Sequence, residues 1–188
     1  MSDLIQHLEI HLGQIVGGWS QHEEGKRLPF QIALFERGPV PGSRTLATLG
    51  LSDVRLKLGE TERRTRQELV LAFRDDFGYR NLPGVLQQVG LEAIQRDRAY
   101  LAGEVIGPRG ELITGSELEA LYVSVPVYFP EGFHVCRPPV GEPIVFGWLV
   151  PICGSEASFI CNQGWAAFEQ KLEHHDPDLL DFGRRSII

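Results

Sequence analysis

Hydrophobic residues recur at two spacings along the chain, and these spacings predict where helices and strands lie. Near the amino terminus the spacing is three or four residues, at Leu4, Leu8, Leu12 and Ile15. This spacing is typical of an amphipathic helix, and the pair Gly17-Gly18 is a suitable end for it. We therefore expect an amino-terminal helix over residues 1–18.

Short apolar runs without helical spacing predict the strands. They lie at residues 30–35, 45–51, 66–73, 102–106, 121–129 and 144–152. The last run, IVFGWLVPI, is the most apolar and predicts a central strand, and the run 66–73 is also expected near the middle of the sheet. Pro126 lacks the amide proton that an inner strand donates, so the strand 121–129 is expected at an edge or a bulge.

Two further helices complete the predicted elements. Pro83 is suited to a first helical turn, and an apolar stripe follows it to about Arg98. Apolar and aromatic residues predict a last helix over 156–174, which would cover the sheet. Helices and strands come in mixed order, without internal repeats or a linker. We expect a single α+β domain over residues 1–188, a mixed β-sheet layered with helices.

The composition is consistent with one folded domain and disfavours nucleic acid as a partner. Of the 188 residues, 43% are hydrophobic and 23% are charged, which is typical of a globular protein. The net charge of -7 disfavours an overall grip on nucleic acid phosphates. The one dense basic stretch, Arg63, Arg64 and Arg66, is interleaved with glutamates, as in a solvated loop. We expect no direct binding to nucleic acid.

Cysteine usage and the amino-terminal residues predict a cytoplasmic location. Cys136, Cys153 and Cys161 are an odd number without a CxxC pair, so reduced thiols are the simplest account. Residues 1–15 carry charged and polar side chains unlike those of a signal peptide, and no apolar run has the length of a membrane span. We expect no membrane partner, and a monomer or a weak homodimer.

Candidate metal-binding and catalytic residues are few. His7 and His11 stand four apart, as two metal ligands on a helix would, but Glu9 is one place away from the position that a metalloprotease helix requires. A polar flank of the helix fits these histidines better. Cys153 and Cys161 flank apolar residues and are interpreted as small core residues.

Cofactor motifs are missing from the sequence. It contains no GxxxxGK[ST] phosphate loop, no GxGxxG fingerprint and no GxSxG elbow. We expect no cofactor, no metal site and no catalytic residues. An enzyme whose carboxylate or cysteine site forms only in the fold, for example around Cys153 or His134, stays an alternative.

The order of several short motifs resembles that of the suppressor-of-fused domain family. A TxGLS-like stretch at residues 48–52 precedes a strand that carries Glu68-Leu69, and the apolar run 146–152 follows. The chain closes with Asp181, Arg184 and Ser186, similar to the family's D-x-x-R-x-S pattern. The resemblance spans about residues 30–188. It implies the fold of the family's amino-terminal domain, in the single-domain form of bacterial members.

The resemblance also implies a protein-binding function without catalysis. Animal members of the family bind an extended peptide of hedgehog-pathway transcription factors, and bacterial members are proposed to be immunity proteins that neutralise toxins. An immunity protein is therefore the first expectation, and a regulatory protein that binds a peptide or a transcription factor is the alternative. The family's peptide-binding face uses an acidic residue after a glycine, which Gly103-Glu104 matches with Glu in place of Asp.

Side chains with large contact areas give the remaining expectations. Trp148 lies in an apolar run and is expected in the core, whereas Trp19, in a glycine-rich polar stretch, is a candidate anchor for a partner. Arg184 or Arg185 is expected to tie the carboxyl-terminal tail to a carboxylate. The candidate partner-binding residues are thus Gly103, Glu104 and Trp19.

Overall fold

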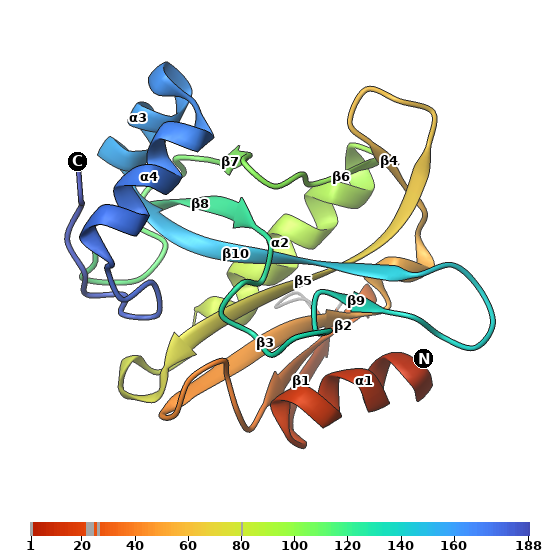
Figure 1. Cartoon of the computed structure of the whole chain (residues 1–188). Coiled ribbons are helices and arrows are strands. Elements are labelled where there is room, and N and C mark those ends of the chain that lie inside the picture. Colours follow the sequence, from red (N-terminus) through yellow and green to blue (C-terminus); the bar gives the residue numbers. More distant parts are fainter. Residues whose placement is uncertain (1, 22–24, 26, 80) are drawn as a thin grey trace.

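A mixed β-sheet runs through the middle of the molecule, with helices on both of its faces (Figure 1). The computed structural model describes residues 2–21, 25, 27–79 and 81–188. The main path of the sheet is β1 (Ile15–Gln21), β2 (Arg27–Phe35), β3 (Ser43–Leu49), β5 (Arg64–Arg74), β10 (Ile144–Cys153), β8 (Leu118–Ser124) and β7 (Val105–Ile106). Strands β5 and β10 are parallel, and the other neighbours on this path are antiparallel. The predicted central strands therefore lie in the middle of the sheet.

Three short strands join this path from the side. They are β4 (Leu56–Leu58), β6 (Arg98–Ala99) and β9 (Val135–Cys136). Strand β4 pairs with both β5 and β6, and β9 pairs with β10. The α-helices are α1 (Ser2–Leu12), α2 (Leu82–Gln95), α3 (Gly154–Gln163) and α4 (Trp165–His175), and the 3-10 helices are η1 (Leu51–Asp53) and η2 (Asp75–Phe77). The α+β fold with a mixed, helix-covered sheet is confirmed.

The central strands β5 and β10 are buried on both faces, and their successive side chains point to opposite sides of the sheet. In β5, Val70 and Ala72 enter the core under α1 and α3, whereas Leu69, Leu71 and Phe73 enter the core under α2. A strand buried on both faces reads as a continuous apolar run. This explains why β5 and β10 were the clearest strands in the sequence.

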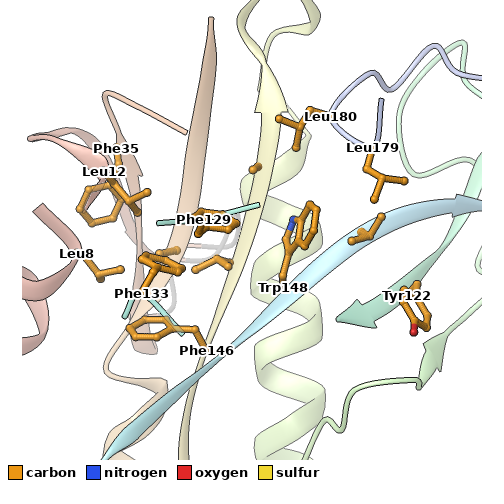
Figure 2. Close-up of a cluster of buried hydrophobic side chains, with 14 of the residues drawn as sticks. Leu8, Leu12, Phe35, Tyr122, Phe129, Phe133, Phe146, Trp148, Leu179 and Leu180 are labelled. Carbon is orange, nitrogen blue, oxygen red and sulfur yellow. The ribbon is translucent and has the colours of Figure 1, made fainter. Parts of the chain in front are cut away.

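Aromatic rings fill the core between the sheet, α1 and the segment that precedes β9 (Figure 2). Phe129 and Phe133 stack with ring centroids 4.4 Å apart, and Phe133 stacks in turn on Phe146 at 5.1 Å. Trp148 of β10 lies edge-on to Phe129 and is buried, so its predicted place in the core is confirmed.

The amino-terminal helix is shorter than predicted. Helix α1 ends at Leu12, because Gly13 takes a φ of 76° and its N–H bonds to the Glu9 carbonyl oxygen. Gly17 and Gly18 lie inside β1, where the inward positions alternate with exposed ones. The helix predicted over residues 1–18 is therefore wrong for 13–18, and Met1 lies outside the described residues.

Two other boundaries differ from the prediction. Strand β8 ends at Ser124, so Pro126 lies in the turn that follows and not at a sheet edge or a bulge. The predicted last helix is two helices, α3 and α4, which Gly164 separates with a φ of 87°. The strand predicted at 102–106 is confirmed only as the two residues of β7.

A buried carboxylate holds the turn that follows β3. Glu68 accepts hydrogen bonds from the Thr48 hydroxyl at 2.5 Å, the Gly50 N–H at 2.9 Å and the Ser52 N–H at 3.1 Å. Burial raises the pKa of Glu68 to about 7, while these donors act in the opposite direction. The TxGLS-like stretch and Glu68 therefore form one structural unit, although they lie apart in the sequence.

A second buried carboxylate fastens the carboxyl-terminal tail. The Arg184 guanidinium donates to both oxygens of Glu156, at 2.7 and 2.8 Å, and the Cys153 N–H also donates to Glu156 at 2.8 Å. The Ile187 N–H adds a bond at 3.1 Å. The expected tie between the tail and a carboxylate is made by Arg184, whereas Arg185 is exposed.

Candidate functional site

Gly103 and Glu104 lie in the turn between β6 and β7, at the free edge of the sheet. Glu104 forms an ion pair with Arg98 and also accepts the Leu101 N–H at 3.1 Å. Its side chain is half-buried. The carboxylate that the sequence singled out is therefore accessible, but it is already engaged within the chain.

An exposed tryptophan covers Gly103. A Cβ atom on Gly103 would lie 2.8 Å from Cγ of Trp165, the first residue of α4, and the φ of Gly103 is 93°. Only glycine accommodates both the backbone conformation and this close approach. Trp165 is 50% exposed, so it presents a large aromatic surface beside Glu104. Trp165 falls within the helix predicted over 156–174, whose apolar and aromatic residues were expected to cover the sheet, so it was missed as a surface residue.

Trp19 lies on β1, at the opposite edge of the sheet, and is half-buried. It packs edge-on against Tyr79 with ring centroids 5.9 Å apart. One side of it lines a depression of about 1270 Å³ that runs along the outer surface of α2. The other lining residues are Gln21, Pro83, Gly84, Gln87, Gln88, Leu91, Glu92, Gln95, Arg96 and Arg109.

A second depression, of about 380 Å³, adjoins the first, and Arg96 and Arg109 line both. It also includes Glu104, Arg98 and Tyr100. We call the two together the α2 groove. The structure thus brings Trp19 to one end of the groove and Glu104 to the other, while Gly103 lies beside it under Trp165.

Charged residues in the α2 groove are paired with one another. Glu92 of α2 forms ion pairs with Arg96, at 2.6 Å, and with Arg109. Tyr100 lies among these charges; burial raises its pKa to about 12, with Glu92 as a further cause. No sequence motif predicted this cluster, because Arg109 and Glu92 lie apart in the sequence and meet only in the fold.

The candidate catalytic and metal-binding residues lie outside the α2 groove. His7 and His11 are neighbours on α1, with ring centroids 4.9 Å apart. His7 Nε2 lies 3.1 Å from the Phe133 carbonyl oxygen, and its ring stacks on Phe146. The pKa of His11 is lowered by burial and by the neighbouring His7. Among the residues that the structure describes, no three His, Cys, Asp or Glu side chains lie close enough together to hold a metal ion.

Neither cysteine that was considered as a nucleophile lines the α2 groove. Cys153 is buried, and burial raises the pKa of its thiol to about 11, which disfavours the reactive thiolate. Cys161 is exposed on α3, so its interpretation as a core residue is wrong. In the described part of the chain, no helix is both long and apolar enough to cross a bilayer.

Comparison with known proteins identifies the family. The sequence profile described as "Suppressor of fused protein (SUFU)" matches residues 26–185. The chain therefore belongs to the suppressor of fused family, and the resemblance seen in its motifs is confirmed. No curated protein sequence matches the chain significantly.

Solved structures share the fold at low sequence identity. A suppressor of fused homologue from Neisseria gonorrhoeae superposes with a TM-score of 0.74 at 17% identity, covering 100% of this chain and 93% of that one. The structure of a Sufu-Fu complex gives 0.71 at 17%, covering 99% and 91%. Drosophila Suppressor of Fused gives 0.67 at 16%, and the match covers 99% of this chain but 50% of that one. The fold is that of a suppressor of fused domain.

Proposed function

We propose that this chain is a protein-binding domain without catalytic activity, and that it takes a segment of its partner in the α2 groove. The observation that carries the proposal is that the two ends of one groove hold Trp19 and Glu104. Both residues were selected from the sequence for independent reasons. A relative of the same fold was solved as a Sufu-Fu complex, which supports a protein as the ligand.

The lining of the groove supports an extended peptide as the bound form. Trp19 and Leu91 supply apolar contact, and the glutamines Gln21, Gln87, Gln88 and Gln95 lie beside them. A glutamine amide both donates and accepts hydrogen bonds, so it can pair with either polar group of a peptide backbone. A small aromatic and aliphatic contact surrounded by such amides is typical of peptide recognition.

We further propose that the partner is a toxin that this chain neutralises. Support comes from the family membership and from the net charge of -7, which would attract a basic protein. A cytoplasmic location and a monomer or weak homodimer are parts of this proposal. The regulatory alternative differs only in the partner.

Co-expression and site-specific crosslinking test the two levels of the proposal. A photo-crosslinking amino acid replaces Gln88, which is exposed in the groove, and in a matched control it replaces Lys171, which is exposed on α4. The chain is expressed with a toxin-like protein encoded by a neighbouring gene. We expect restored growth and an adduct with the toxin at position 88 but not at position 171.

The outcomes separate the alternatives. Rescue of growth with an adduct only at position 171 would place the binding face elsewhere and refute the groove. An adduct at position 88 with a different, endogenous protein would favour the regulatory alternative. Turnover of a small molecule by the purified chain, abolished by truncation of a groove residue, would revive the enzyme alternative.

A further inference from the structure

Three arginines from separate elements converge on the end of the α2 groove that holds Glu104. Arg96 directly follows α2, Arg98 begins β6, and Arg109 follows β7. All three line the smaller depression, together with Tyr100. Arg96 and Arg98 are two positions apart in the sequence, and the fold brings Arg109 to them.

The arginines are more accessible than the carboxylates that pair with them. The side chains of Glu92 and Glu104 are 12% and 24% exposed, whereas those of Arg96, Arg98 and Arg109 are 63%, 34% and 32% exposed. A molecule that enters the depression therefore meets guanidinium groups before it meets carboxylates. The three arginines also exceed the two glutamates by one positive charge, on a chain whose net charge is -7.

Donors of these arginines stay available after their internal pairing. A guanidinium carries five N–H groups. Arg109 contacts Glu92 through Nη2, and Arg96 contacts it through Nη2 as well. In the described residues, Nε of Arg98 is buried and has no hydrogen-bond partner. Because that Nε is enclosed, the donors within reach of an incoming anionic group are the remaining Nη N–H groups of the three arginines.

Glu104, in contrast, has little capacity left for a partner. Both of its oxygens accept from Arg98, and the Leu101 N–H adds a third bond. A cationic side chain of a partner would have to displace Arg98 from a contact within its own turn. Glu104 thus acts as a positioning residue that orients Arg98.

We propose that this depression binds a carboxylate, supplied by an Asp or Glu side chain of the partner segment in the α2 groove. The inference rests on the proposed function and adds the chemistry of the segment. A carboxylate between Arg98 and Arg109 offers two acceptor oxygens and a full negative charge, so it forms bidentate hydrogen bonds between opposite charges. Glutamine in the segment offers one neutral acceptor oxygen, and lysine offers none. The net negative charge of the chain then attracts a basic partner during the encounter, and the arginines select a carboxylate of the bound segment afterwards.

Nuclear magnetic resonance of the arginine Nε–H groups tests the proposal with three blocked peptides. The peptides have the same apolar residues and differ at two positions, which are Glu, Gln or Lys. We expect the Glu peptide to shift the Arg98 and Arg109 resonances and to bind about tenfold more tightly than the others, as charge-assisted hydrogen bonds require. Arg109→Gln should remove that preference while Arg96 continues to pair with Glu92. The matched control is Arg185→Gln, which changes the charge equally at an exposed position outside the groove.

Each result decides the matter. Equal binding of the three peptides, or a preference for the Lys peptide, overturns the carboxylate site but leaves the groove as a peptide-binding surface. If none of the three peptides binds, the carboxylate site is overturned too. The crosslink at position 88 then tests the proposed function independently. Inorganic phosphate is the second probe. If phosphate shifts the same resonances and the Glu peptide does not, the site takes a free anion and the proposal fails.

Discussion

Glu68 and Glu156 are both fully buried carboxylates, but they are satisfied by different groups. Glu68 is surrounded by neutral donors, the Thr48 hydroxyl and two backbone N–H groups. Glu156 instead faces the guanidinium of Arg184, which is itself 5% exposed. One carboxylate joins β3 to β5, and the other joins α3 to the carboxyl-terminal tail.

The difference shows that hydrogen bonds and a counter-charge are not equivalent ways to bury a carboxylate. Neutral donors satisfy the oxygens but offset only part of the cost of removing the charge from water, so the pKa of Glu68 is raised to about 7. A bidentate guanidinium neutralises the charge, and the pair then depends on both partners being present. We expect the Glu68 region to respond to pH and the Glu156 region to respond to mutation of its partner.

The largest effect is expected from Arg184→Met. It leaves Glu156 buried without its counter-charge, which typically costs about 3–5 kcal/mol of unfolding free energy. Denaturant unfolding of the variant measures this loss. The control Arg185→Met, at the exposed neighbouring position, should stay within about 0.5 kcal/mol of the parent. Equal losses from the two variants would show that the buried pair has no special role.

A pH dependence is the next largest expected effect. Because the pKa of Glu68 is raised from 4.5 to about 7 on folding, the folded state binds the proton more tightly. This contribution to stability is complete below pH 4.5 and is lost as the pH rises through 7, by up to about 3 kcal/mol. Denaturant unfolding between pH 4 and 8 measures it as the difference between the parent and Glu68→Gln. A difference that does not vary with pH would contradict the account.

The smallest effect on stability is expected from Glu104→Gln in the α2 groove. Its ion pair with Arg98 is partly exposed, and such pairs contribute at most about 1 kcal/mol. Thermal or denaturant unfolding should therefore scarcely distinguish this variant from the parent. Glu156→Gln, the same change in the buried pair, should be clearly less stable. A large loss from Glu104→Gln would mean that the turn at Gly103 depends on this carboxylate.

Sequence periodicity predicted the interior of the fold better than its boundaries. Strands β5 and β10 were recognised because both of their faces are buried. The end of α1 was misplaced, because Ile15 continues the helical spacing of Leu4, Leu8 and Leu12 by chance, while Gly13 had already ended the helix. The break at Gly164 was hidden for the same reason, since the apolar spacing continues across it.

The candidate site was predictable only in part. Gly103 and Glu104 were selected by the resemblance to the family, and Trp19 was selected because it lies in a glycine-rich polar stretch. The structure places these residues in or beside the α2 groove. The cluster of Arg96, Arg98 and Arg109 could not be found, since Arg109 joins the other two only in the fold, through its ion pair with Glu92 of α2. A Gly-Trp pair in the middle of a predicted helix was the one available signal for Trp165.

The three tryptophans lie in places where their fluorescence can show whether a molecule is bound in the α2 groove. Trp148 is enclosed in the core, Trp19 lies at one end of the α2 groove, and Trp165 rests on Gly103 near the other. Iodide or acrylamide in solution should quench the last two and spare the first. Intrinsic fluorescence therefore offers an unlabelled readout, with an internal reference, for any molecule that shields either end.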